Sequence, residues 1–472
     1  MTKRSSSTSQ RSLKPQTPGR CLGTRSKQKP NTTGSYNMGH RIHRRGMLKG
    51  SAWLAGAAAV LSGANAARAE ASGEPVPIGQ AAPLTDFAAA DGVEFRNGLI
   101  MACDEINALG GILGRPLEPH FEDTKQMGDA TNVQAVQRLI DRYGVHAVIN
   151  GYNTGSGSAV QDAIADAGII YMHNDTSSGH GVLIGSDPER YFGSFQTDPS
   201  ETWYGSGLLK FLSSLTDGGT FAPANRKLAI ILSAGTYSSN IANVVREGAA
   251  ELGWEVSLYE TVNVPISEWG PTLSKLRQDP PGVIVVTHYF PADLAQFMVQ
   301  FMTNPTPSLI YMQYGPSVKS FRDIAGPAAA GVVFSTVIGA LQDEIGLDFE
   351  ARYKARFGDD AGHNSGVQSY NAAWIWAAAA ALAGGSGAPG EEEQNRKVAE
   401  RIRAMIHRGP NGTTRFMPGE QAAASYPGGT DDPSLGMPHQ FLQIQDHTAE
   451  PVLIAPWPYA KAGFITPPWI RG

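Results

Sequence analysis

Apolar and polar positions along the chain follow a pattern that predicts a strand–helix–strand unit, repeated many times. The first unit has apolar strands at 76–82 and 117–122, with a helix in the stretch 92–115 between them. The helix has an apolar stripe at helical spacing, and its acidic residues fall off that stripe. The stripe consists of Phe95, Leu99, Ala102 and Ile106. Gly110 and Gly111 end the helix, because glycine allows the positive φ angles that a tight turn requires.

The same unit recurs in two series. The first continues with a helix at about 130–142 and strands at 145–149 and 169–172. The second is expected to contain helices at 201–215 and 241–252 and strands at 228–232, 256–260, 282–287, 309–312 and 332–335. The C-terminal part is expected to contain helices at 349–357, 370–382 and 395–407, a Gly/Pro-rich segment at 410–438 and a hairpin at 439–454. Apolar strands alternating with helices predict parallel sheets covered on both faces.

The charge is distributed unevenly. Residues 1–69 contain 13 of the 38 Lys and Arg residues and none of the 43 Asp and Glu residues, so the remainder is strongly acidic. An acidic body is a poor partner for nucleic acid and suits a protein outside the cytoplasm. The 472 residues are enough for two domains. Cys21 lies in the basic region, so the rest has one thiol, Cys103, which we expect in a helix core.

The N-terminal region is typical of an export signal. Residues 1–37 have almost nothing to bury and are expected to be disordered. Arg44-Arg45 precede a mild apolar run at 52–61, and Ala67-Arg68-Ala69 forms a small-x-small cleavage site. This pattern predicts a twin-arginine signal peptide, cleaved near Ala69, and a periplasmic location. The apolar run is too short for a stable transmembrane helix. Twin-arginine leaders carry folded proteins, so an exported enzyme stays among the alternatives.

The ends of the predicted strands indicate where a ligand binds. In open α/β sheets, ligands bind outside the carboxyl ends of the strands. Most of the loops at these ends are rich in hydroxyl, amide, carboxyl or glycine residues. The loops are 83–86, 151–158, 173–178, 234–239, 288–290 and 313–315. Two such sheets facing each other would form a polar cleft with aromatic walls.

Candidate binding residues lie in these loops. The loop 151–158 opens into a helix, whose N-terminal N–H groups favour an anion, and Ser156 could add a hydroxyl or simply cap that helix. Asp175 is a candidate for a substrate amine or amide N–H, or it is a plain turn residue. Tyr237, Tyr289 and Tyr314 could pack on a ligand or belong to the core.

No catalytic set is recognisable. The segment GGILG follows a helix and is not a dinucleotide fingerprint, and there is no phosphate-binding lysine loop. No nucleophile elbow with acid and histidine partners can be identified, and the histidines are scattered. We therefore expect no enzyme activity, no cofactor and no metal.

Four segments carry a family resemblance: INALGGILGRPLEPHFED, INGYNTGSGSAV, LSAGTYSSN and HYFPADLAQF. In their order and spacing the chain resembles the periplasmic type I solute-binding proteins, which include leucine/isoleucine/valine-binding and urea/amide-binding members. The resemblance implies an α/β fold of two doubly wound parallel-sheet lobes joined by a three-stranded hinge. It places residues 70–195 and about 336–438 in lobe 1. Residues 196–335 and about 439–472 would form lobe 2.

The resemblance also implies roles for individual residues. Thr154 and Ser156 resemble the contact to a ligand carboxylate or amide, Asp175 and Thr176 the second contact of the first lobe, and Tyr237 the tyrosine of the second lobe. Amino-acid-binding members have an acid near the position of the segment MQYGPS, which has none. Either Asp175 substitutes for that acid, or the ligand lacks a free amine.

The functional expectation is a solute-binding component of an ABC importer. It would bind a small polar solute that is amino-acid-like, amide or urea-like, and its partner would be a membrane permease. A ligand sensor that reuses this fold is the alternative, and an exported enzyme is a weaker one.

Overall fold

The computed structural model describes residues 71–85, 88–125, 128–152 and 158–470. All of these ranges belong to one compact unit, Ala67–Gly472. Within them, no helix combines the length and the apolar character that a membrane crossing requires.

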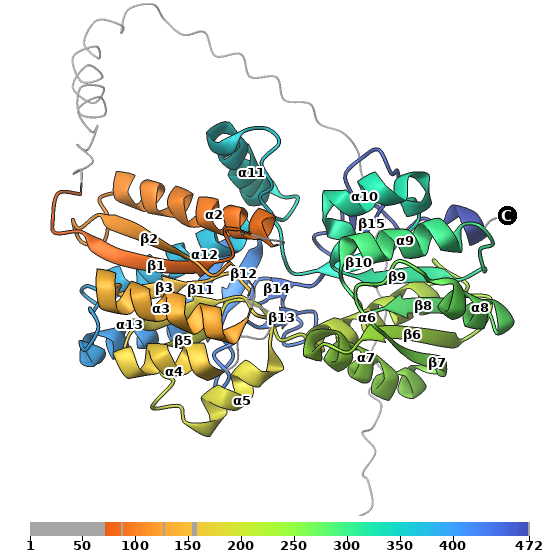
Figure 1. The fold of residues 1–472 in the computed structure, drawn as a ribbon, viewed down its shortest axis with the longest axis horizontal. Helices are drawn as coiled ribbons and strands as arrows, with labels where there is room; N and C mark the ends of the chain where they lie inside the picture. The colour runs from red at the N-terminus through yellow and green to blue at the C-terminus, as the bar shows by residue number, and fades with distance from the viewer. Residues whose placement is uncertain (1–70, 86–87, 126–127, 153–157, 471–472) are drawn as a thin grey trace, which may run out of the picture. The chain divides into compact units, whose positions relative to one another are not determined.

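The first sheet is entirely parallel, with strand order β2-β1-β3-β4-β5. Its strands are β1 (Val76–Ala82), β2 (Leu117–Asp123), β3 (Ala147–Ile149), β4 (Ile170–His173) and β5 (Ser194–Gln196). Helices α2 (Ala89–Ala108), α12 (Gly366–Leu382) and α13 (Glu392–Ala404) pack on one face. Helices α3 (Asp129–Tyr143) and α4 (Ser158–Ala167) pack on the other. We call this sheet and its helices, with α5 (Ser178–Ser186), the first lobe (Figure 1).

Two helices of the first lobe pack unusually closely. Helix α12 is rich in alanine and buried on nearly every side, as expected for a helix that is apolar all round. Its first residue, Gly366, lies against Gly98 of α2, where a Cβ atom on Gly98 would come within 1.9 Å of the Gly366 carbonyl oxygen. A glycine is therefore needed at Gly98. Cys103 lies buried in the same core, as predicted.

The second sheet has seven strands in the order β16-β15-β10-β9-β8-β6-β7. Its strands are β6 (Lys227–Ser233), β7 (Glu255–Val262), β8 (Val283–Val286), β9 (Leu309–Gln313), β10 (Val333–Thr336), β15 (Gln440–Gln443) and β16 (Val452–Ala455). Strand β15 pairs antiparallel with both β10 and β16, and the other pairs of this sheet are parallel, so the predicted C-terminal hairpin is confirmed. Helices α6 (Thr202–Asp217) and α7 (Thr236–Ala249) cover one face. Helices α8 (Gly270–Gln278), α9 (Pro291–Phe301) and α10 (Lys319–Ala325) cover the other, and together they form the second lobe.

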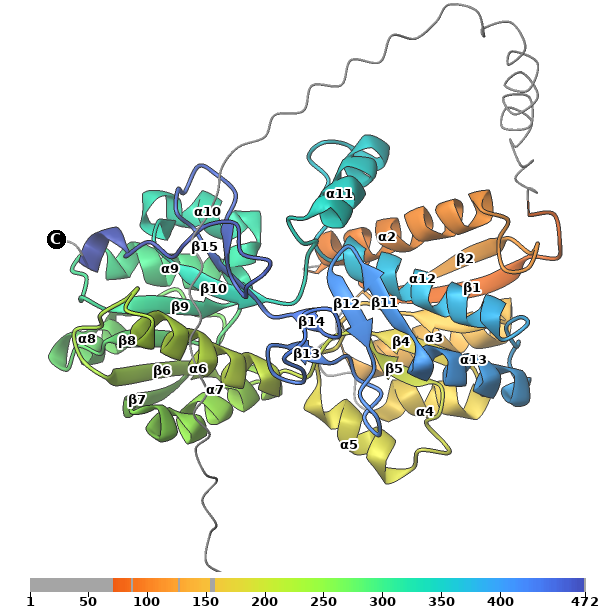
Figure 2. The same cartoon turned by 180° about the vertical axis from the view of Figure 1, so that it is seen from behind.

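The remaining elements are short or connect the lobes. They are α11 (Glu344–Phe357), the strands β11 (Ile406–Gly409), β12 (Gly412–Arg415), β13 (Ser425–Tyr426) and β14 (Met437–Pro438), and the 3₁₀ turns η1 (Ala250–Leu252), η2 (Gly315–Ser317), η3 (Gly326–Ala329) and η4 (Pro468–Ile470). The chain passes between the two sheets after β5, after β10 and before β15. In Figures 1 and 2 the pair β13–β14 lies between the two sheets. The exact lobe limits stay a prediction.

Most predicted strands agree with the structure, and strand 76–82 coincides with β1. The predicted start of the helix at 241 is wrong, because α7 begins at Thr236 and takes in hydroxyl residues that had been assigned to a loop. The predicted helix 395–407 ends at Ala404, and β11 follows at Ile406. The segment 410–438 contains the short strands β12 to β14 where only a loop was expected.

Candidate functional site

The loops at the carboxyl ends of the strands contribute residues from both lobes. Thr154 and Ser156 lie outside the described residues, so their predicted roles stay predictions. Asp175 and Thr176 follow β4 in the first lobe. Tyr237, Tyr289 and Tyr314 come from the second lobe, after β6, β8 and β9.

One pair of tyrosines joins the two lobes. The hydroxyl oxygens of Tyr152, after β3, and Tyr314, after β9, are 3.5 Å apart. The ring of Tyr152 packs edge-on against Phe95 of α2, with 5.2 Å between the centroids. Its hydroxyl also hydrogen-bonds to the Asp91 carboxylate. The structure therefore brings Tyr314 next to residues that the sequence analysis had not connected with it.

The other two predicted tyrosines lie together. The Tyr237 ring packs edge-on against Tyr289, with centroids 5.3 Å apart, and against Tyr204, with centroids 5.9 Å apart. The Tyr237 hydroxyl oxygen accepts a hydrogen bond of 2.9 Å from the Gln313 amide. Burial raises the pKa of Tyr237 well above its usual value, so this side chain acts as a neutral hydroxyl.

A buried network orients Gln313. The Tyr311 hydroxyl donates to Gln313 Oε1 at 2.6 Å, so the amide nitrogen of Gln313 is directed at Tyr237. The Tyr311 hydroxyl also contacts the Ser335 hydroxyl, which lies 2.7 Å from His439 Nε2. Gln313 therefore has a defined orientation. It stands near the position at which amino-acid-binding members of the resembled family have an acidic residue, which this chain lacks.

The structure changes the interpretation of Asp175. Its carboxylate lies 3.1 Å from Nδ1 of the buried His173, whose Nε2 lies 3.1 Å from Nδ1 of His180. The Asp175 side chain is nearly buried, with 8% of its surface exposed. Since His173 already engages this carboxylate, Asp175 is a poorer anchor for a ligand amine than the sequence indicated.

Two predicted site residues have strained backbones. Thr176 has a φ angle of 46° and Tyr314 one of 52°, and both are unusual for residues other than glycine. For a β-branched residue such as Thr176 this conformation is a genuine outlier. Strain of about 1–3 kcal/mol per residue is characteristic of binding and catalytic sites. This observation supports the choice of both residues from the sequence.

A second contact between the lobes was missed. Glu201, at the start of α6, is 1% exposed, and its carboxylate accepts hydrogen bonds from four donors. Ser178 of the first lobe donates through its N–H at 2.6 Å and its hydroxyl at 2.8 Å. The Ser200 hydroxyl donates at 2.9 Å, and the amide of Asn240 on α7 donates at 2.6 Å. We call Ser178, Glu201 and Asn240 the latch, and no pattern in the sequence connects them.

Three further polar residues of the first lobe were also missed. Asp91 and Glu94 lie in the first two turns of α2, and Glu94 accepts a hydrogen bond of 2.7 Å from the Ser365 N–H. Burial raises the pKa of Glu94 to about 7. Asn174 is 1% exposed, and neither atom of its amide has a hydrogen-bond partner. Helices that follow parallel strands begin at the binding edge, so the position of Asp91 could have been recognised from that rule.

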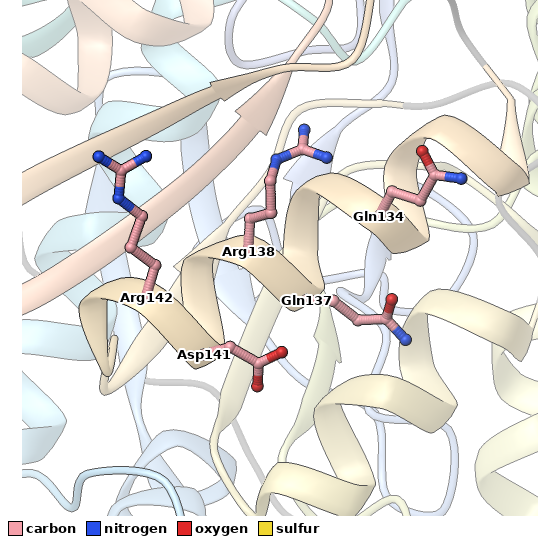
Figure 3. A pocket seen from close by; sticks show the side chains of 5 residues that line it. All are labelled: Gln134, Gln137, Arg138, Asp141 and Arg142. Carbon is pink, nitrogen blue, oxygen red and sulfur yellow. The ribbon is translucent and has the colours of Figure 1, made fainter.

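Other features of the surface do not add to the site. A depression of about 440 Å³ is lined by one face of α3. Figure 3 shows the side chains that line it. Its Arg138 pairs with Glu122 at 2.6 Å, and none of the residues that line it belongs to the loops described above. In the part of the chain that the structure describes, no group of three or more His, Cys, Asp or Glu side chains could hold a metal ion.

Sequence comparison relates the chain to solute-binding proteins. A family profile described as periplasmic binding protein matches residues 75–429. The leucine-, isoleucine-, valine-, threonine-, and alanine-binding protein of Pseudomonas aeruginosa is 24% identical over 370 residues. That alignment covers 78% of this chain and 93% of the Pseudomonas protein.

Structure comparison gives the same picture. A protein from Silicibacter pomeroyi, provisionally named a branched-chain amino acid ABC transporter, is 56% identical with a TM-score of 0.82. The match covers 84% of this chain and all of that one, 100%. The substrate-binding protein LivJ of Streptococcus pneumoniae, solved with isoleucine, is 17% identical with a TM-score of 0.63, covering 80% of this chain and 100% of LivJ. At that identity the second likeness shows the fold alone.

Proposed function

The chain belongs to the periplasmic binding protein family, and we propose that it is the solute-binding component of an ABC importer for a small amino acid. The fold is the type I fold of that family, with two parallel-sheet lobes. Members of the family bind solutes and do not catalyse reactions. The family is periplasmic, and the predicted twin-arginine signal peptide, cleaved near Ala69, accounts for export.

The names of relatives support a branched-chain or similarly small amino acid. The Pseudomonas protein is named as a binding protein for leucine, isoleucine, valine, threonine and alanine. The Silicibacter protein is provisionally named a branched-chain amino acid ABC transporter. The tyrosines around Tyr237 offer apolar ring surface and neutral hydroxyls, which suit a small zwitterion with an aliphatic side chain. We therefore place amides and urea behind amino acids as candidates.

The proposed binding residues come from both lobes. Thr154, Ser156, Asp175 and Thr176 would contribute from the first lobe, and Tyr237, Tyr289 and Tyr314 from the second. The helices α4, α5, α7 and α9 begin at or directly after these loops, and the positive end of such a helix dipole would favour a ligand carboxylate. No cofactor is required for such a site.

The single observation that carries the proposal is the meeting of the two lobes at Tyr152 and Tyr314, which the bonds of Ser178 to Glu201 in the latch accompany. A ligand held by residues of both lobes would favour the form in which these contacts exist. That closed form would be recognised by a membrane permease, the proposed partner.

A thermal-shift screen tests the proposal. Purified protein is heated with leucine, isoleucine, valine, threonine, alanine, short amides, urea or small carboxylates. A ligand at about 100 times its dissociation constant should add about 2.7 kcal/mol of stability and raise the melting temperature clearly. A rise with one or more amino acids supports the proposal, and no rise with any of them contradicts it.

A further inference from the structure

We propose that the Asp91 carboxylate holds the amino group of the ligand, so that the solute is an amino acid and not an amide, urea or an amine-free acid. This inference rests on the proposed function and extends it. It assigns the negative charge of the site to the first helix of the first lobe.

Asp91 is well placed for this role. It lies in the first turn of α2, which begins where β1 ends at the binding edge of the first sheet. The side chain is half-buried, and it accepts hydrogen bonds from the hydroxyls of Tyr152 and Ser365, the second at 3.3 Å. A carboxylate can accept about four hydrogen bonds, so these two neutral donors leave acceptor capacity for an ammonium group.

The opposite lobe meets Asp91 through a tyrosine. Tyr314 reaches Tyr152, and the pKa of the Tyr314 hydroxyl is raised first by burial and then by the nearby Asp91 charge. The loop around Tyr314 has no acid of its own. Asp91 therefore supplies from the first lobe the charge that this loop of the second lobe lacks.

The other acids near the site already have strong partners. Asp175 is paired with His173, and Glu201 accepts hydrogen bonds from four donors. Glu94, on α2, accepts a hydrogen bond from the N–H of Ser365, the residue before the start of α12. Among the described residues, Asp91 forms no salt bridge. A half-buried carboxylate without a cation gains most from a ligand that brings one.

The test compares two ligands that differ in the amine. Isothermal titration measures the affinity of the purified protein and of the D91N variant for L-leucine and for 4-methylpentanoate, which has the same side chain and carboxylate but no amine. Asn keeps the shape and one acceptor oxygen for Tyr152 and Ser365, while the charge and the second acceptor oxygen are lost. We expect D91N to weaken leucine binding about 30-fold or more, as for a charge that loses its partner. Binding of 4-methylpentanoate should be weak in the wild type and unchanged in D91N.

Two further variants control for folding and position. D104N changes an exposed acid on the same helix, paired with Arg356, and should bind leucine as the wild type does. Y152F keeps the ring but removes the hydroxyl that bonds to Asp91. It should weaken leucine more than 4-methylpentanoate, because both ligands lose the contact with Tyr314 between the lobes and only leucine depends on Asp91. All variants should show the circular dichroism spectrum of the wild type.

The outcomes separate this inference from the proposed function. If the wild type binds leucine and D91N binds it equally well, the inference is overturned and the proposed function stands. Equal affinity of the wild type for leucine and 4-methylpentanoate also overturns the inference. If no amino acid binds, both fail.

Discussion

The latch gives a direct test of how the lobes cooperate in binding. Asn240 on α7 donates a 2.6 Å hydrogen bond to Glu201 and reaches the Ser178 hydroxyl of the first lobe at 3.3 Å. The Glu201 carboxylate is 1% exposed, so water cannot easily replace a lost donor. Replacing Asn240 with alanine removes the only contribution of α7 to the latch that the structure describes, and it leaves the other three donors to Glu201 in place.

The size of the effect follows from the bond that crosses between the lobes. Glu201 and Asn240 both belong to the second lobe, so only the Asn240 bond to the Ser178 hydroxyl depends on closure. A hydrogen bond between neutral groups contributes about 0.5–1.5 kcal/mol. Ligand affinity depends on the population of the closed form, and each 1.4 kcal/mol is a factor of about ten. We therefore expect Asn240→Ala to weaken ligand binding about 2- to 12-fold.

Isothermal titration with the best ligand of the thermal-shift screen measures this change. Ser239→Ala is the matched control, because Ser239 lies next to Asn240 on α7 but bonds within its own lobe, to the Ser233 carbonyl at 3.2 Å. The control should bind as the wild type does. Unchanged affinity in Asn240→Ala, together with a lower melting temperature, would mean that the latch persists in every form of the protein and would refute its role in closure.

Three predictions concern stability and are measured by denaturant unfolding. Burial raises the pKa of Glu94 from 4.5 to about 7, so between these pH values the folded state holds a proton that the unfolded state has lost. As pH rises from 4.5 to 7, the free energy of unfolding of the wild type should therefore fall by about 3 kcal/mol more than that of E94Q. Equal losses would contradict this. Burial lowers the pKa of His439 from 6.5 to about 3, so in this pH range the unfolded state binds a proton that the folded state does not. As pH falls from 6.5 to about 3, the free energy of unfolding should fall by up to about 5 kcal/mol in the wild type, but not in H439Q. G98A should cost about 1–3 kcal/mol because its Cβ meets the Gly366 carbonyl, whereas G185A on α5, with open space around it, should be neutral or slightly stabilising. If G98A were as stable as G185A, the close contact between α2 and α12 would be wrong.

Local patterns predicted much of the fold. The strand β1 and the hairpin of β15 and β16 could be predicted from the sequence. Strands buried in a sheet consist of short apolar runs bounded by turn residues, and these runs are visible in the sequence. The start of α7 could not, because Thr236 and its hydroxyl neighbours have the composition of a loop. In the structure they form the first turn of a helix whose buried face begins only at Ser238.

The sequence predicted which loops the candidate site residues occupy, but not which residues they contact. The carboxyl-end rule selected Tyr237, Tyr289 and Tyr314, and the structure puts the first two in contact. The pairing of Tyr314 with Tyr152, and of Asn240 with Ser178, joins residues far apart in the sequence. Such pairs depend on how the lobes meet, and no local pattern records that.

The central claim is that this protein binds an amino acid. The decisive measurement is an isothermal titration of L-leucine into the purified protein, repeated with isoleucine and valine. We predict one site per chain for at least one of them, with a dissociation constant on the order of micromolar, or about −8 kcal/mol. Absence of binding by all three, with clear binding of an amide or of an amine-free acid, would contradict both the proposed solute and the role of Asp91.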